Sequence, residues 1–277
     1  MSEILAIPAP TWFVGCGNLG GAILDGWRMG ELNLSPVTVI RPSGKAIDGA
    51  RVVTSFEQAG ATPKLAVLAF KPQKLGEIAP QLAPFIGAET IVVSLLAGVE
   101  LATLRRHFPR SLGIVRATPN LPVAVRRGVT GLYGDLTGGA LKQQVGDLFV
   151  ALGFAMWMAD EEKLGALGAV AGAGPAYVAR FIAALAKAGV ARGLSEEIAA
   201  TLALETVLGT AWMAATSGET MGAVVKRVAS PNGTTEAGLA VLDKALDDLI
   251  GATIEAASRR GAELAEAAKL ASEASLH

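Results

Sequence analysis

The residues best suited to chemistry lie in a glycine-rich turn near the start of the chain. An apolar segment ends at Val14, and the turn after it has the pattern G-x-G-x-x-G and leads into a helix-like segment. In such a turn the first glycine allows the tight bend, the second lets the backbone approach a pyrophosphate, and the third lets helix and strand pack closely. A plain structural turn is the alternative. The pattern predicts a dinucleotide site formed by Gly15, Cys16, Gly17, Asn18, Leu19 and Gly20.

A second candidate site is the loop of residues 230–236, which has the sequence S-P-N-G-T-T-E and precedes a helix-like segment. Hydroxyls and free N–H groups at a helix N-terminus form a cradle that suits a small carboxylate. Ordinary helix capping by Thr234, with Glu236 in the first turn, explains the same residues equally well.

The end of the second expected strand, at residue 40, indicates which dinucleotide is bound. A site that prefers NAD has an acidic residue about 20 positions after the fingerprint. This chain instead has Arg41, Ser43 and Lys45 there. Cations and a hydroxyl favour a 2′-phosphate, so we expect NADP, with NAD possible as a second cofactor. The alternative is a loop whose charges are only solvated.

Alternating strands and helices must position these residues. The segments between 6 and 158 predict strands and intervening helices, which is the signature of a Rossmann-type doubly wound α/β domain. We also expect a helix to open at residues 97–99 and another to cover about 137–152. Lys71, at the end of a buried strand, should line the ligand crevice. The first expected strand is formed by the last residues of the segment 6–14, and the others lie at residues 37–40, 51–54, 65–70, 90–96, 112–117, 129–133 and 155–158.

The pattern changes near residue 160, where alanine-rich helical periodicity replaces the strands. We therefore predict a dinucleotide-binding domain over residues 1–159 and an all-α domain over residues 160–277 that binds substrate and dimerises. Residues 176–192 are apolar nearly all round, so we expect that helix to be buried against a second subunit. The expected helices cover residues 176–192, 195–217, 220–228, 235–250 and 251–271.

Composition excludes several classes of protein. Of 277 residues, 51% are hydrophobic and 18% charged, with a formal net charge of −1, so the chain can bury a core and lacks the clustered cations that nucleic acids require. One cysteine and no evident signal peptide predict a cytoplasmic protein. The uncharged stretch 164–179 is too short for a membrane span, and we expect residues 172–175 to break it. We expect no bound metal, since neither His107 nor His277 belongs to a ligand cluster.

Taken together, the motifs resemble those of the pyrroline-5-carboxylate reductase family over nearly the whole chain. The glycine-rich turn, the triad Phe70-Lys71-Pro72, and residues 94–99 and 116–122 match family motifs in the first half. In the second half, residues 172–177 and 230–235 resemble G-S-G-P-A-Y and S-P-G-G-T-T. The chain departs from the family pattern at Thr118, Ala171, Ala173, Asn232 and residues 165–168. The hydroxyls lost at Ala171, Ala173 and residues 165–168 would alter how the substrate is anchored.

The resemblance implies a reaction and a set of roles. A nicotinamide hydride would reduce the cyclic imine 1-pyrroline-5-carboxylate to L-proline, in a homodimer or larger homo-oligomer formed by the C-terminal helices. Thr235 would hydrogen-bond the substrate as the catalytic residue. The other implied substrate contacts are Ser230, Asn232, Gly233, Thr234 and Gly174, and the further cofactor contacts are Phe70, Lys71, Pro72, Ala97, Gly98, Pro119 and Asn120.

Three other functions fit parts of the sequence. A β-hydroxyacid dehydrogenase shares the plan of the first half, but it uses a catalytic lysine on a long helix, a setting that neither Lys163 nor Lys187 has. Another imine reductase would act on a different cyclic imine. An NADP-binding regulator without turnover would keep the three glycines and would not need the loop of residues 230–235.

Overall fold

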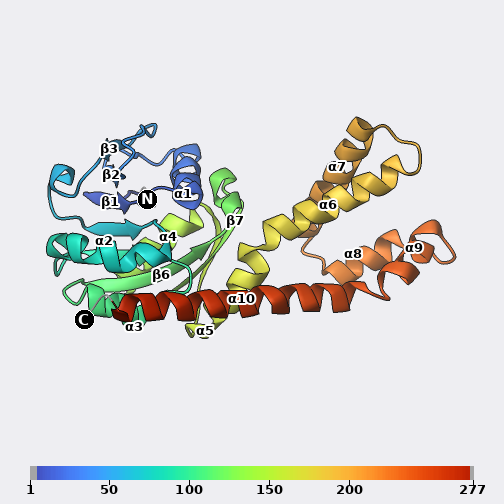
Figure 1. The fold of residues 1–277 in the computed structure, drawn as a ribbon. Helices are drawn as coiled ribbons and strands as arrows, with labels where there is room; N and C mark the ends of the chain where they lie inside the picture. The colour runs from blue at the N-terminus through green and yellow to red at the C-terminus, as the bar shows by residue number, and fades with distance from the viewer. Residues whose placement is uncertain (1–4, 275–277) are drawn as a thin grey trace. The chain divides into compact units, whose positions relative to one another are not determined.

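The computed structural model describes residues 5–274, and an eight-stranded sheet forms its first half (Figure 1). The strand order is β3-β2-β1-β4-β5-β6-β7-β8, and every neighbouring pair is parallel except β6 and β7. This arrangement confirms the predicted Rossmann-type fold. The strands are β1 (Thr11–Val14), β2 (Val37–Ile40), β3 (Arg51–Val53), β4 (Leu65–Leu68), β5 (Ile91–Ser94), β6 (Gly113–Pro119), β7 (Gly128–Gly134) and β8 (Gly153–Trp157).

Helices cover both faces of the sheet, which explains why β1, β2, β4 and β5 are buried at every residue. Adjacent residues of β1 point to opposite faces. Phe13 meets Trp27 edge-on, with ring centroids 5.7 Å apart, in one core layer, and Trp12 lies in the other near Phe56 and Phe85. The helices of this half are α1 (Asn18–Met29), α2 (Leu75–Leu82), α3 (Leu101–His107), α4 (Gly139–Val150) and α5 (Glu162–Leu167).

The second half is helical, as predicted. One expected boundary is wrong: the chain breaks at residues 243–245, and Gly251 lies inside the last helix. Glycine inside a helix costs only about 1 kcal/mol, so it does not by itself end one. The helices are α6 (Gly174–Val190), α7 (Glu196–Ser217), α8 (Met221–Val228), α9 (Thr234–Leu242) and α10 (Leu246–Ala274).

Two further local expectations are wrong. Residues 97–99 form a turn rather than a helix start, since Gly98 has a φ of +77° and α3 begins only at Leu101. The expected break at residues 172–175 is a bend at Ala173 after a π-helical turn, Gly168–Gly172, so that α5 and α6 follow one another almost without interruption.

The described chain separates into two compact units, one of residues 5–173 with 257–274 and one of residues 174–256. The domain boundary expected after residue 159 marks the change in secondary structure and remains a prediction about domain division. In the first unit a buried hydrophobic core lies on each face of the sheet. In the second unit most side chains are exposed, and α6 buries none of its residues.

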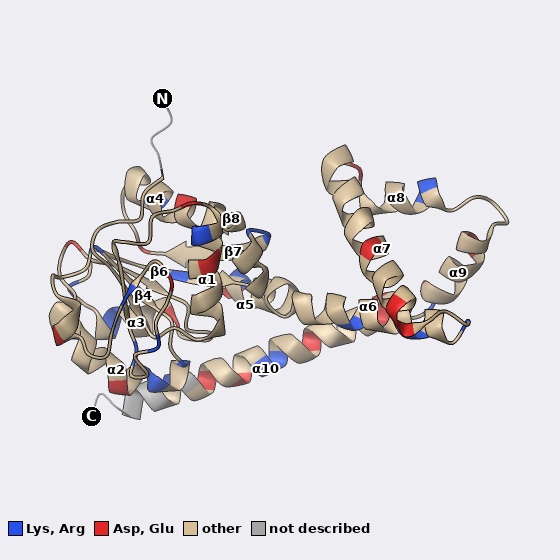
Figure 2. Ribbon diagram, turned by 90° about the horizontal axis from the view of Figure 1, so that it is seen from above, with Lys and Arg blue, Asp and Glu red and all other residues tan. Residues whose placement is uncertain are grey.

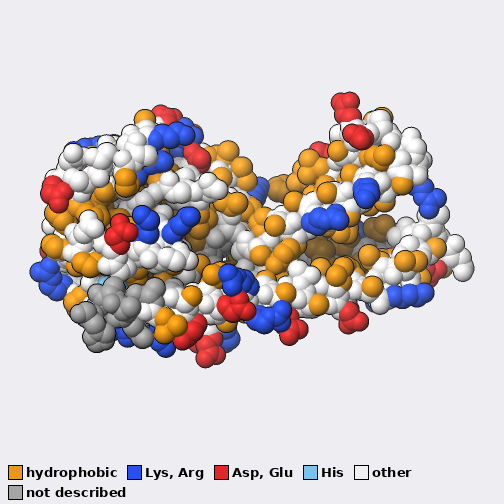
Figure 3. Space-filling model, in the orientation of Figure 1, with side chains coloured by type: hydrophobic (Ala, Val, Ile, Leu, Met, Phe, Trp, Pro, Cys, Tyr) orange, Lys and Arg blue, Asp and Glu red, His pale blue; other side chains and the backbone are white. Residues whose placement is uncertain are grey.

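The helices of the second unit expose large apolar side chains (Figure 3). Charged residues of both signs run along α10, whereas α6 to α9 are mostly uncharged (Figure 2). By length and composition alone, two helical stretches among residues 5–274 are apolar enough to cross a membrane, Glu162–Val190 and Glu196–Ser217. Exposed apolar residues of α6 and α7 include Val178, Phe181, Leu185, Ile198, Leu202, Leu204, Leu208 and Trp212.

Candidate cofactor and substrate sites

Each glycine of the first turn occupies a position that fits its expected role. Gly15 has a φ of +81°, and a Cβ there would lie 2.9 Å from the carbonyl oxygen of Ala69. Gly17 faces open space, with nothing within 4 Å of a Cβ, which leaves room for a ligand to approach the backbone. Gly20 is buried, and a Cβ there would lie 3.2 Å from that of Ala69, so a glycine lets α1 pack closely on β4.

The start of α1 is open to an anion. Gly17 is the N-cap residue and provides no side-chain cap, and the first turn contains no acidic residue. Gly17 and Asn18 are exposed. The N–H groups of a first helical turn have no partner within their own helix, so those of Asn18, Leu19 and Gly20 can bind phosphate oxygens.

Cys16 is a packing residue of this turn. Burial raises the pKa of its thiol, a nearby Arg41 charge lowers it, and Asp25 raises it further, with burial the largest of these effects. The thiol is therefore neutral at pH 7. Its Sγ lies 3.6 Å from where a Cβ on Gly20 would stand, so it contributes to the close packing of the turn.

Arg41 and Ser43 lie beside the glycine-rich turn because the N–H of Gly15 donates to the carbonyl oxygen of Ile40 at 2.8 Å. The Nε of Arg41 donates to the Ser43 hydroxyl at 2.9 Å, and the N–H of Lys45 approaches the same oxygen at 3.4 Å. Arg41 is half-buried, and Ser43 and Lys45 are exposed. Two cationic side chains and a hydroxyl at this edge suit a phosphate dianion.

The strand ends that follow bring in the next predicted contacts. The N–H of Ala69 donates to the carbonyl oxygen of Val14 at 2.8 Å, which places the end of β4 beside the end of β1. The N–H of Leu95 donates to the carbonyl oxygen of Leu68 at 3.0 Å, which places the end of β5 beside that of β4. Phe70 and Pro72 are half-buried, and Lys71 and Ala97 are exposed. Lys71 precedes a short 3₁₀ turn, Pro72–Lys74.

Pro119 and Asn120 are buried at the end of β6, and the amide of Asn120 has a structural use. Its Nδ2 donates to Ala171 at 2.9 Å, and its Oδ1 accepts from the N–H of Val129 at 2.8 Å. The side chain thus holds three segments together at the carboxyl edge of the sheet. A cofactor contact from Asn120 would use its backbone or its remaining N–H.

The second unit places the loop of residues 230–235 at the start of α9. Gly233 is the N-cap residue and Thr234 is the first helical residue, so the structure does not place Thr234 in the capping role. The N–H of Asn232, at a φ of +58°, donates to Glu236 Oε2 at 2.6 Å. A Cβ on Gly233 would lie 2.5 Å from the Ser230 hydroxyl. The first N–H groups of α9 therefore receive no side-chain cap from the N-cap residue and can hold a carboxylate.

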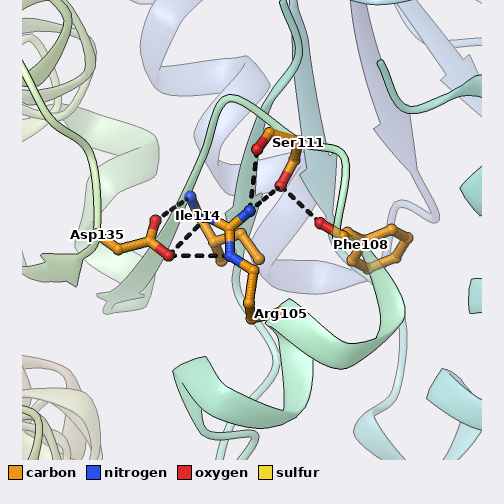
Figure 4. Close-up of polar contacts among 5 residues, drawn as sticks. All are labelled: Arg105, Phe108, Ser111, Ile114 and Asp135. Carbon is orange, nitrogen blue, oxygen red and sulfur yellow. Dashed lines mark hydrogen bonds and ion pairs between the residues drawn. The ribbon is translucent and has the colours of Figure 1, made fainter. Parts of the chain in front are cut away.

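Other polar clusters have structural roles. Arg105 donates to Asp135 at 2.6 and 3.0 Å and to Ser111 at 2.9 and 3.0 Å, and Asp135 also accepts from the N–H of Ile114 (Figure 4). This network joins the end of α3 to the start of β6. Within residues 5–274, no cluster of three or more His, Cys, Asp or Glu side chains has the spacing of a metal site.

Two surface cavities of the described chain lie away from the predicted site residues. One of about 470 Å³ is lined by α2, α3 and their following turns, including His107. Another of about 690 Å³ lies between residues 125–129 and the end of α4. The predicted contacts of the first unit instead lie along the carboxyl edge of the parallel strands, where open α/β sheets bind ligands.

Sequence comparison decides the family. Over 265 residues the chain is 36% identical to pyrroline-5-carboxylate reductase of Pseudomonas aeruginosa, covering 92% of this chain and 96% of that protein. The chain belongs to the pyrroline-5-carboxylate reductase family. A reductase from pea, Pisum sativum, is 33% identical over 93% of this chain and 98% of its own length. The protein-family model described as pyrroline-5-carboxylate reductase dimerisation matches residues 161–264 of this chain.

Solved structures of the pyrroline-5-carboxylate reductase family have the same fold. The Coxiella burnetii reductase has a TM-score of 0.84 at 29% identity, over 93% of this chain and 99% of that chain. The Plasmodium falciparum pyrroline carboxylate reductase, solved with NADP bound, has a TM-score of 0.83 at 26% identity, over 93% and 98%. Both membrane-length helical stretches begin and end within the matched dimerisation region, so their apolar faces belong to a family dimerisation domain.

Sequence reasoning missed one ion pair of the first unit. Arg116 donates to Glu161 Oε1 at 2.6 Å, and the N–H of Leu101 donates to the same oxygen at 2.7 Å. The two charged residues are 45 positions apart, so no local pattern relates them. Arg116 does belong to the motif of residues 116–122, which was the available signal.

Proposed function

We propose that this chain reduces 1-pyrroline-5-carboxylate to L-proline with a nicotinamide cofactor, NADPH in preference to NADH. The observation that carries the proposal is 36% identity to a pyrroline-5-carboxylate reductase over 96% of that protein's length. The geometry of the glycine-rich turn and of the loop before α9 supports it, because each has the open helix N-terminus that its anionic ligand requires.

The residues present fit the cofactor. Gly17 leaves space for a pyrophosphate, the first turn of α1 offers its N–H groups, and Arg41 with Ser43 would hold the 2′-phosphate. When bound, the nicotinamide supplies a hydride to C5 of the imine. Ala97 and Gly98 lie on the edge of the sheet where the ring would rest.

The chain itself binds and orients the substrate. Backbone N–H groups of Thr234 and Thr235, in the first turn of α9, would hold the carboxylate, and the Thr235 hydroxyl would hydrogen-bond the imino acid. A cyclic imine that binds in its protonated form already has an electrophilic carbon, so positioning rather than acid–base chemistry lowers the barrier. This requirement matches a candidate site with no histidine among the predicted residues.

The exposed apolar faces of α6 and α7 support a homodimer or a larger homo-oligomer, because monomeric soluble proteins rarely expose large continuous apolar surfaces. Pairing of two subunits would cover these faces. We accordingly propose a cytoplasmic enzyme that requires neither a membrane nor a nucleic acid.

The deciding experiment measures NADPH oxidation by the purified protein with 1-pyrroline-5-carboxylate. We expect saturable turnover that yields proline, and slower turnover with NADH. Parallel assays use a larger cyclic imine with NADPH, and β-hydroxyacids with NADP. Activity only on hydroxyacids, or tight NADPH binding with no turnover of any substrate, would overturn the proposal in favour of a dehydrogenase or a regulator.

A further inference from the structure

The turn between β5 and α3 carries Ala97 and Gly98, which are expected beside the nicotinamide. The sheet fixes the N-terminal end of this turn, because the N–H of Leu95 donates to the carbonyl oxygen of Leu68. The rest of the turn is held by two parts of the chain that are distant in sequence. Neither of these parts was expected to contribute to the site.

The first support is the side chain of Glu161. Its Oε1 accepts hydrogen bonds from the N–H of Leu101, at 2.7 Å, and from Arg116, at 2.6 Å. The N–H groups of a first helical turn have no intrahelical partner, and a carboxylate is a strong acceptor for one of them. The side chains of Arg116 and Glu161 are only 13% and 28% exposed, so solvent screens this ion pair less than it screens an exposed one.

The second support is α10. Gly98 has a φ of +77°, and a Cβ on it would lie 2.8 Å from the Cα of Ala265 and 3.1 Å from its Cβ. Ala265 belongs to the segment of α10 that joins the first compact unit. It is half-buried, while its neighbours Leu264 and Glu266 are exposed. The helix backbone therefore packs directly on the turn, and the contact is possible because residue 98 is a glycine and residue 265 an alanine.

We propose that Glu161 and Ala265 are positioning residues that fix this turn where the nicotinamide ring rests. The proposal rests on the proposed function. Neither residue would touch the reacting atoms. A displacement of about 1 Å in the turn would lower hydride transfer by as much as about 10²-fold. Affinity for NADPH would change little, because its phosphates are held at the ends of β1 and β2.

The first experiment compares Glu161→Ala with Glu161→Gln, which keeps an oxygen acceptor for Leu101. Glu162→Ala removes the neighbouring exposed carboxylate and is the matched control. We expect Glu161→Ala to lower kcat by about 10-fold or more with the Kd for NADPH within about threefold of wild type. Glu161→Gln should recover most of kcat, and Glu162→Ala should match wild type. A folded Glu161→Ala with unchanged kcat would overturn the proposal, and so would a loss that glutamine does not restore.

The second experiment tests the other support and also keeps the proposal testable if Glu161→Ala does not fold. Ala265→Leu should displace the turn and lower kcat, whereas Ala265→Gly should stay close to wild type. Amide hydrogen exchange of residues 95–101 should increase in Ala265→Leu without added substrate. This readout requires no activity, so an inactive wild-type protein would refute the proposed function alone, and unchanged exchange would refute the positioning role.

Discussion

The Nε of Arg41 lies 2.9 Å from the hydroxyl oxygen of Ser43, to which it donates a hydrogen bond at the end of β2. This bond orients the guanidinium before any cofactor arrives. Since β2 pairs with β1, the oriented charge stands beside the glycine-rich turn. We therefore predict that the cofactor preference of the chain depends on these two residues of one short loop.

Replacing Arg41 by alanine should raise the KM for NADPH by about 10-fold or more, since a hydrogen bond to a charged group contributes about 1.5–3 kcal/mol. The KM for NADH should change little, because NADH lacks the 2′-phosphate. Steady-state kinetics with both cofactors measure the effect. Lys64→Ala, which removes an exposed cation from the opposite edge of the sheet, is the control. Equal losses with NADH and NADPH would refute a role in recognising the 2′-phosphate.

Alanine substitutions at two glycines of the first turn should have different effects. At Gly17 a Cβ meets nothing within 4 Å, so Gly17→Ala should fold normally and lose NADPH affinity by intruding on the ligand. At Gly15 the positive φ and the Ala69 carbonyl make Gly15→Ala less stable by about 1–3 kcal/mol. Denaturant unfolding and NADPH titration separate the two outcomes. A Gly17→Ala variant that binds NADPH like wild type would contradict the predicted pyrophosphate site.

Thr235→Ala should impair turnover more than cofactor binding. Loss of one hydroxyl contact with a charged substrate should lower kcat/KM by about 10-fold or more, with the Kd for NADPH unchanged. Thr216→Ala is a suitable control, because the Thr216 hydroxyl donates within its own helix to Trp212 at 2.9 Å. If the kinetics of Thr235→Ala are indistinguishable from those of the wild type, Thr235 does not have the proposed role of hydrogen-bonding the substrate.

His107 should make stability depend on pH. Burial, and then the charge of Arg106, lower the pKa of its imidazole below the ordinary 6.5. The unfolded chain therefore binds this proton at a higher pH than the folded one does. Its contribution to the free energy of unfolding is complete above pH 6.5 and is lost as the pH falls through the lower folded pKa. Unfolding of His107→Gln across this range should show a smaller acid-side decrease than wild type, and identical pH profiles would contradict the prediction.

Leu208→Asp should weaken self-association. Leu208 is 55% exposed on α7, and a carboxylate buried without a partner at a subunit interface costs several kcal/mol. Light scattering coupled to size-exclusion chromatography should show a lower mass at micromolar protein. Lys226→Asp, an exposed substitution on α8, should leave the mass unchanged. A Leu208→Asp variant with the wild-type mass would place the interface on another surface.

The sequence by itself determined the order of strands and helices, the change to an all-α half and the two helix N-termini suited to anions. Hydrophobic periodicity and the spacing of glycines are local, so they can be recognised without a structure. The tertiary structure decided what depends on distant residues. It showed that the amide of Asn120 joins Ala171 to Val129, that Arg116 meets Glu161, and that Ala265 packs on Gly98. It also showed that α10 runs through Gly251. None of these contacts has a local pattern, because each results from how the sheet and the last helix bring distant segments together.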